Sequence, residues 1–180
     1  SAIGRRSFQM NRGAEKAGGE VLYFIHADCR PPENYGAAIL ESVGEGHGYG
    51  CFRRKVGDES EEDKALGFIS FVSRFRGPMF RGGDASLFVE RRVYEEAGAF
   101  NEEMVLKEDF EILPRLRKKT KFRLLPDYVI ASNRKHIENG FSWRVHFASM
   151  LVWAMYYVGF GQNSLLKTYR YFIHGSKYHK

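Results

Sequence analysis

The chain has 180 residues, a length that suits one domain rather than two. Hydrophobic residues make up 43% and aromatic residues 15%, which is enough apolar material for a core and excludes a wholly disordered chain. The two cysteines, Cys29 and Cys51, are too few for a disulfide-rich scaffold and lack the CxxC spacing of a structural zinc site. No secretory signal pattern is visible, so we expect a reducing, cytoplasmic compartment.

The net charge of +6 hides a division of the chain into an acidic and a basic part. Residues 1–112 contain 15 Lys and Arg against 20 Asp and Glu, whereas residues 113–180 contain 13 against 2. A basic final third can meet nucleic acid, anionic lipid or a phosphorylated substrate, or it can be a solvated face without a partner. Charge alone leaves these alternatives open.

Helical and extended patterns alternate along most of the chain. Val21–Ile25 is a continuous apolar run between Gly18-Gly19 and Pro31-Pro32, which is typical of a strand buried on both faces. The elements that we expect are helices over 7–17, 32–43, 64–75, 92–97 and 108–119, and strands over 21–25, 48–54, 86–89, 122–125 and 129–132. This alternation predicts an α/β sandwich with a largely parallel sheet.

The C-terminal tail is expected to be helical from Phe141 onward. Val145–Leu166 contains no charged residue, and its strongly apolar part, Phe147–Gly161, has 15 residues. A helix that spans a membrane needs about 20 apolar residues, so we interpret the segment as one long core or interfacial helix. We expect a partial domain over residues 1–138 and a helical extension over 139–180, packed on that domain or on a membrane surface.

Two groups of polar residues stand where a ligand would lie. Asp28 follows the strand Val21–Ile25, and ligands of open α/β sheets bind beyond the carboxyl ends of strands. Asp28 can cap the next helix or hold a divalent cation, and both interpretations stay open. His26 points to the same side as Asp28 and can assist a metal or have a structural role.

Glu108 and Asp109 begin an expected helix. Their carboxylates can stabilise the helix dipole, or one of them can act as a general base toward a bound hydroxyl. Gly82-Gly83-Asp84 precedes an expected strand. Paired glycines allow a backbone to approach a ligand closely, although they also make ordinary turns.

These segments occur in a recognisable order. Taken along the chain they read Arg6-x-x-Gln9-Met10-Asn11-x-Gly13-Ala14, Gly19-Glu20, His26-Ala27-Asp28, Gly83-Asp84-x-x-x-Phe88-Val89, Gly98-x-Phe100, Glu108-Asp109-x-Glu111-x-x-x-Arg115-Leu116-Arg117 and Ala131-Ser132-x-Arg134. The order and spacing resemble family 2 glycosyltransferases of the GT-A fold. The nearest subgroup is the bacterial one whose metal motif reads His-Ala-Asp. The resemblance covers about residues 5–160.

The resemblance implies an inverting transfer of a sugar from a nucleotide-diphosphate donor to an acceptor hydroxyl, assisted by Mg²⁺ or Mn²⁺. It implies that Asp109, with its neighbour Glu108, supplies the catalytic base. The implied metal residues are Asp28, His26 and His136, and the implied residues near the donor are Arg6, Asn11, Gly83, Asp84, Arg134 and Lys135. It also implies a GT-A-like, Rossmann-like sheet flanked by helices and followed by a helical tail.

The chain departs from the family pattern at its start. Relatives begin with about two strand–helix units before the segment equivalent to Arg6, and those units hold the nucleotide base and ribose. We therefore expect an N-terminally truncated domain that alone binds a sugar nucleotide weakly or not at all. Micromolar binding of UDP- or GDP-sugars with Mn²⁺ in calorimetry would contradict this expectation.

Other functions are weighed against the transferase. One alternative is a non-catalytic remnant, and another is a basic module that binds nucleic acid or an anionic surface. No helix-turn-helix, zinc-finger or RNA-recognition signature is visible, so we do not expect a nucleic-acid partner. Aromatic and basic residues in and around the tail suggest a peripheral contact with the inner face of the membrane, and a homodimer contact is a further expectation.

Overall fold

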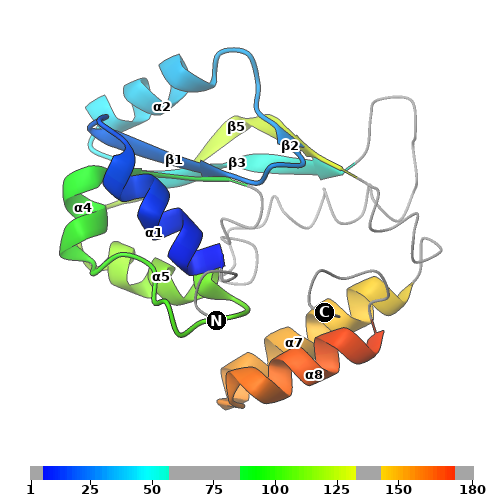
Figure 1. Ribbon diagram of the computed structural model, residues 1–180. Helices are drawn as coiled ribbons and strands as arrows, with labels where there is room; N and C mark the ends of the chain where they lie inside the picture. The colour runs from blue at the N-terminus through cyan, green and yellow to red at the C-terminus, as the bar shows by residue number, and fades with distance from the viewer. Residues whose placement is uncertain (1–5, 57–85, 133–142, 173–180) are drawn as a thin grey trace.

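The computed structural model describes residues 6–56, 86–132 and 143–172 (Figure 1). Five strands form one sheet in the order β1-β4-β3-β5-β2. The helices are α1 (Arg6–Lys16), α2 (Tyr35–Gly44), α4 (Arg91–Glu96), α5 (Glu108–Arg117), α7 (Trp143–Val158) and α8 (Gln162–Phe172). The strands are β1 (Val21–Ile25), β2 (Cys29–Arg30), β3 (Tyr49–Val56), β4 (Ser86–Glu90) and β5 (Phe122–Ala131). The expected helix over 64–75 lies outside the described residues.

The sheet is mixed, so the prediction of a largely parallel sheet is only partly confirmed. Only β3 and β5 pair in parallel, whereas β1–β4, β3–β4 and β2–β5 are antiparallel pairs among the described residues. β1, β3 and β5 run in one direction. β4, which lies between β1 and β3, and β2, which pairs with β5, run in the other. The two short strands that we expected after residue 121 form the single strand β5, whose pairing with β3 shifts register at Pro126 and Asp127. Pro126 has no N–H for the ladder, which explains the irregularity there.

Helices cover both faces of the sheet. On one face, α1, α4 and α5 pack on alternate strand residues such as Leu87 and Val89. On the other face, α2 places Ile39 against Phe88 and its neighbours in a second cluster. The alternation along β4 follows from the period of two residues in a strand, and it explains why Ser86–Val89 is buried throughout.

The tail forms two helices rather than the one long helix that we expected. The break lies at Gly159, whose φ of +92° is a conformation that favours glycine. Figure 1 shows α7 and α8 side by side, away from the sheet. Val152 and Leu165 pack with Leu106, so the helix pair is attached next to the start of α5.

The surface of the helix pair keeps several large apolar side chains exposed, namely Phe147, Met150, Tyr157, Val158, Phe160 and Tyr171. None of the helices that the structure describes is long and apolar enough to cross a membrane. Contact of this surface with a membrane or with a second copy of the chain stays a prediction.

Burial of Cys51 predicts a loss of stability in alkaline solution. Burial raises the pKa of this thiol from its ordinary 9.0 to about 12. The unfolded chain therefore releases the proton first, so the contribution to stability is complete below about pH 9 and is lost as pH rises toward 12. From pH 8 to pH 10.5, we expect the free energy of unfolding in urea to fall by about 2 kcal/mol more in the wild type than in Cys51→Ala. Equal changes in both proteins would contradict this.

Candidate active site

Three segments that are far apart in sequence meet at one end of β1. Arg6 begins α1, His26 follows β1, and Glu108 begins α5. Arg6 Nη2 lies 2.6 Å from His26 Nε2, and Arg6 Nε lies 2.9 Å from Glu108 Oε1. One guanidinium therefore connects the end of the edge strand β1 to the first turn of α5.

The Arg6–Glu108 pair lies in a mostly dry environment. Glu108 is 2% exposed, whereas the Arg6 side chain is 27% exposed. Glu108 Oε1 receives no hydrogen bond of good geometry, so the pair is held by the attraction between the two charges. A buried carboxylate is costly without a nearby cation, and Arg6 supplies that cation.

The contact between Arg6 and His26 also fixes the tautomer of the imidazole. A guanidinium has only donors, so His26 Nε2 accepts the hydrogen bond and the proton of the neutral ring lies on Nδ1. The lone pair of Nε2 is thus engaged by Arg6 in this arrangement.

A pocket of about 340 Å³ opens between α1 and the edge strand β1. Its volume falls in the range of small-molecule sites, and its walls are mostly apolar. The lining residues with ionisable side chains are Arg6, Tyr23, His26 and Asp109. A cation, an imidazole and a carboxylate therefore face one apolar cavity, an arrangement that can orient a charged ligand and move a proton.

Asp109 reaches this pocket from the first turn of α5. The residue before the helix, Lys107, has a φ of +67°, so the chain enters α5 through a left-handed residue. Asp109 is 6% exposed, and its Oδ1 accepts a hydrogen bond from the Phe110 N–H at 3.1 Å. The positive end of the helix dipole stabilises both carboxylates of this turn.

Asn11 has a structural role in the described arrangement. Its Nδ2 donates to Phe100 O and to Glu102 Oε1, both at 2.9 Å. Its Oδ1 accepts from the Tyr94 hydroxyl at 2.6 Å and from the Phe100 N–H at 3.1 Å. These four bonds use the whole capacity of the amide, so Asn11 holds the turn after α4 in place. Its predicted contact with a donor stays a prediction.

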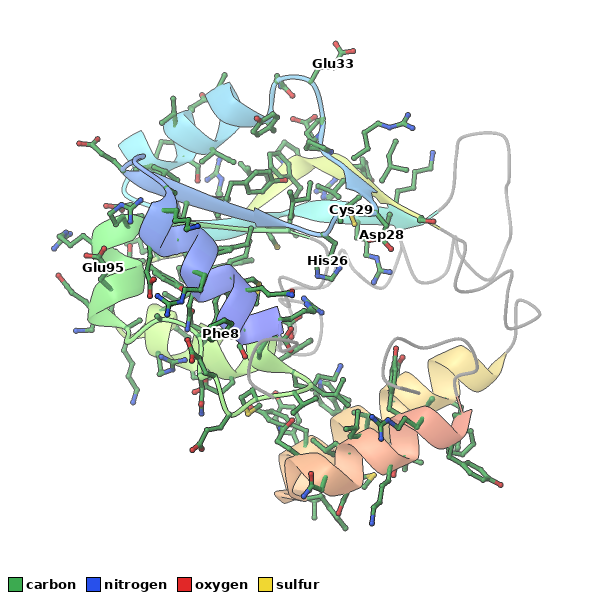
Figure 2. All side chains as sticks on the ribbon, viewed as in Figure 1. Phe8, His26, Asp28, Cys29, Glu33 and Glu95 are labelled. Atoms are coloured by element: carbon green, nitrogen blue, oxygen red, sulfur yellow. The ribbon has the colours of Figure 1, made fainter. Side chains whose placement is uncertain are left out.

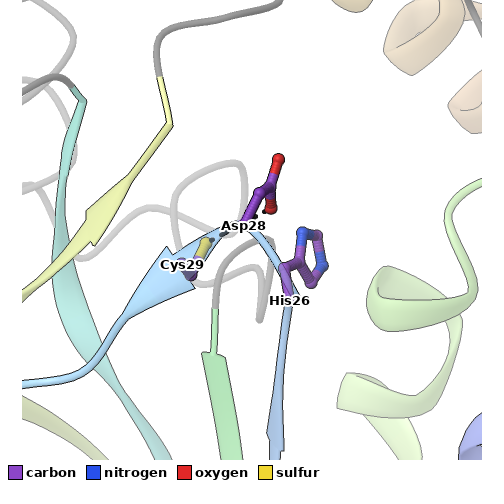
Figure 3. A group of neighbouring side chains, drawn as sticks. All are labelled: His26, Asp28 and Cys29. Atoms are coloured by element: carbon purple, nitrogen blue, oxygen red, sulfur yellow. Dashed lines mark hydrogen bonds between the residues drawn. The ribbon is translucent and has the colours of Figure 1, made fainter.

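The turn between β1 and β2 brings together a second group. A nitrogen of His26, an Asp28 carboxylate oxygen and Cys29 Sγ all lie within 4.8 Å of one another (Figure 3). Asp28 is exposed, whereas His26 and Cys29 are half-buried (Figure 2). The alternative in which Asp28 caps the next helix is wrong, because α2 begins only at Tyr35, after Asn34.

Cys29 is the residue at this site that sequence reasoning missed. Its Sγ lies 3.8 Å from Asp28 Oδ1, a distance at which the thiol donates a weak hydrogen bond. The signal in the sequence is the segment His26-Ala27-Asp28-Cys29, in which three of the four side chains carry a possible metal-ligand atom. The two cysteines lack CxxC spacing, which excludes a structural zinc site of that pattern. Spacing does not indicate the role of a single cysteine.

Five predicted site residues lie outside the described residues. They are Gly83, Asp84, Arg134, Lys135 and His136. Of the other predicted residues, Arg6, His26, Glu108 and Asp109 come together, Asp28 lies beside His26, and Asn11 contacts the turn after α4.

Comparisons with known proteins support the fold. No family model matches the sequence, and no curated protein matches it. Among solved structures, the chain is similar to the crystal structure of S. aureus TarS 1–349, with a TM-score of 0.55, 11% identity, and coverage of 94% of this chain and 50% of that chain. TarS is a glycosyltransferase. The fold resembles that of a glycosyltransferase.

This likeness concerns the fold alone, because the two sequences are only 11% identical. The chain spans half the length of the TarS structure. The mixed sheet with flanking helices agrees with the expected α/β class.

Proposed function

We propose that the protein transfers a sugar from a nucleotide-diphosphate donor to an acceptor hydroxyl with inversion at the sugar carbon. The observation that carries the proposal is the meeting of Arg6, His26 and Asp109 around one pocket, on a fold that resembles a glycosyltransferase. A guanidinium suits a diphosphate, and a carboxylate in the same cavity suits removal of a hydroxyl proton.

Each residue has a distinct role in this proposal. The acceptor oxygen attacks the sugar carbon from the face opposite the diphosphate, its proton passes to Asp109, and the bond between sugar and diphosphate breaks. Glu108 is a positioning residue, because its contact is with Arg6. Arg6 binds the donor diphosphate, and Gly83, Asp84, Arg134 and Lys135 support the donor or the acceptor. Asn11 would contact the donor in exchange for one of its four internal hydrogen bonds.

The residues of the β1–β2 turn fit a divalent cation for this reaction. Asp28 offers an exposed carboxylate oxygen, and His26 would offer a ring nitrogen in exchange for its hydrogen bond with Arg6. This donor set suits Mn²⁺ better than Mg²⁺, which prefers oxygen alone. When bound, such an ion would neutralise charge on the leaving diphosphate. His136 is a proposed additional ligand. Asp28 and His26 would hold the ion beside the pocket.

The test measures free nucleoside diphosphate released from a panel of UDP- and GDP-sugars with Mn²⁺ or Mg²⁺. It uses the 180-residue chain and, if the gene encodes more residues, the complete gene product. We expect metal-dependent release, and we expect Asp28→Asn to raise the metal concentration for half-maximal rate by roughly tenfold or more. Glu33→Gln, which changes an exposed carboxylate just before α2, is the control and should match the wild type. Absence of release from every donor, or an unaltered metal requirement in Asp28→Asn, would contradict the proposal.

A further inference from the structure

We propose that Gln162, the first residue of α8, is a positioning residue that holds Asp109 at the pocket. The inference rests on the proposed function, in which Asp109 takes the proton of the acceptor. It also gives the pair of helices α7 and α8 a part in the site, because Gln162 joins α8 to the loop before α5.

The side-chain amide of Gln162 makes three contacts with that loop. Its Oε1 accepts hydrogen bonds from the Val105 N–H and the Leu106 N–H, both at 3.0 Å. Its Nε2 lies 3.3 Å from Met104 Sδ, a thioether that accepts only a weak hydrogen bond. One amide therefore holds three consecutive loop residues, and both lone pairs of its oxygen are used.

These hydrogen bonds satisfy backbone groups of a segment that is neither helix nor strand. Residues 104–106 lie between α4 and α5, where Leu106 is buried and Val105 is half-buried. A buried N–H needs an acceptor, and here the side chain of Gln162 supplies one to both residues. Removal of the amide would leave the two N–H groups without that acceptor and would loosen the loop.

The same loop is also held by α1 and by apolar packing. Ser7 is fully buried, and its hydroxyl donates to Met104 O at 3.2 Å. Leu106 packs with Val152 of α7 and Leu165 of α8. Contacts from helices near both ends of the chain therefore fix the path of the backbone before α5.

The loop leads directly into the turn that carries the proposed base. Lys107 follows Leu106, and its carbonyl accepts the N–H groups of Phe110 and Glu111 at 3.1 and 3.0 Å. Asp109 lies within this turn and lines the pocket. Because Lys107 alone separates Leu106 from the turn, a displacement of the loop would move the Asp109 carboxylate.

Steady-state sugar transfer by variants of Gln162 tests the inference. Gln162→Met keeps a side chain of similar length without the amide, and we expect kcat to fall about 10- to 100-fold with little change in the donor KM. Gln162→Glu keeps an oxygen that accepts both N–H groups and should stay within about threefold of the wild type. Asn163→Leu, at the next and exposed position of α8, is the matched control and should match the wild type.

A double variant shows whether Gln162 acts through Asp109. In an Asp109→Asn background, Gln162→Met should lower kcat by less than about threefold, because an asparagine that cannot take the proton loses little when it moves. A further loss as large as that in the wild-type background would overturn the inference. An unaltered kcat in Gln162→Met alone, or equal losses in Gln162→Met and Asn163→Leu, would do the same.

Hydrogen exchange of backbone amides tests the inference without turnover. We expect Gln162→Met to speed exchange at Val105 and Leu106 roughly tenfold or more, and at Phe110 in the first turn of α5 as well, while Gln162→Glu stays close to the wild type. Circular dichroism checks that each variant is folded. Unchanged exchange at Phe110 would overturn the inference whatever the activity. If the wild type transfers no sugar while exchange at Phe110 responds, the proposed function fails and the hold of Gln162 on this turn stands, so the two failures are distinguishable.

Discussion

Arg6→Met should lower the free energy of unfolding by about 3 kcal/mol. The methionine keeps an apolar stem of similar length in α1, but it removes the cation that lies 2.9 Å from Glu108 Oε1. Glu108 is 2% exposed, so its charge would stay buried without compensation. Urea denaturation at neutral pH, followed by far-ultraviolet circular dichroism, measures the loss.

Two further variants separate the buried ion pair from general effects on α1. Arg12→Met removes an arginine of the same helix whose partner is Glu15, and both side chains are more than half exposed, so we expect no measurable change. Adding Glu108→Gln to Arg6→Met replaces the orphaned charge by a neutral amide and should recover part of the lost stability. Equal losses in the two arginine variants, or no recovery in the double variant, would show that the pair does not act as described.

The elements of the fold could largely be predicted from local sequence, but their arrangement could not. Val21–Ile25 is a strand because its apolar run lies between Gly18-Gly19 and Pro31-Pro32, and these signals are all local. The direction of β4 is not a local property. The alternation of residues along β4 suits a strand of either direction. The direction is set by the contacts of β4 with both β1 and β3, to which it is antiparallel.

The candidate site was predictable to a similar extent. Position after a strand identified Asp28, and position at a helix start identified Asp109. The Arg6 contact with Glu108 joins residues 102 positions apart, as their numbers show, so no spacing rule could indicate it. The place of Asn11 in a family-like motif predicts a ligand contact, which stays a prediction. Its four hydrogen bonds join it to residues 94–102, and no spacing rule could indicate them either.

Asp109→Asn should reduce the rate constant of sugar transfer by about 10²- to 10⁴-fold while changing the KM for the donor little. The amide has nearly the same shape as the carboxylate, and its oxygen can still accept the Phe110 N–H. What it loses is the ability to take a proton from the acceptor. The measurement is steady-state transfer at saturating donor across a range of pH, and Glu103→Gln, an exposed position in the preceding loop, is the control.

The neighbouring carboxylate provides the sharpest contrast with this result. Glu108 contacts Arg6, whereas Asp109 lines the pocket. Substitutions at the two positions should therefore have different effects on the kinetics of transfer. Glu108→Gln should weaken donor binding through a less well-held Arg6, and it should keep the dependence of rate on pH that a general base produces. Asp109→Asn should abolish that dependence. If Glu108→Gln removes the pH dependence and Asp109→Asn retains it, the base is Glu108 and the roles of the two carboxylates are reversed.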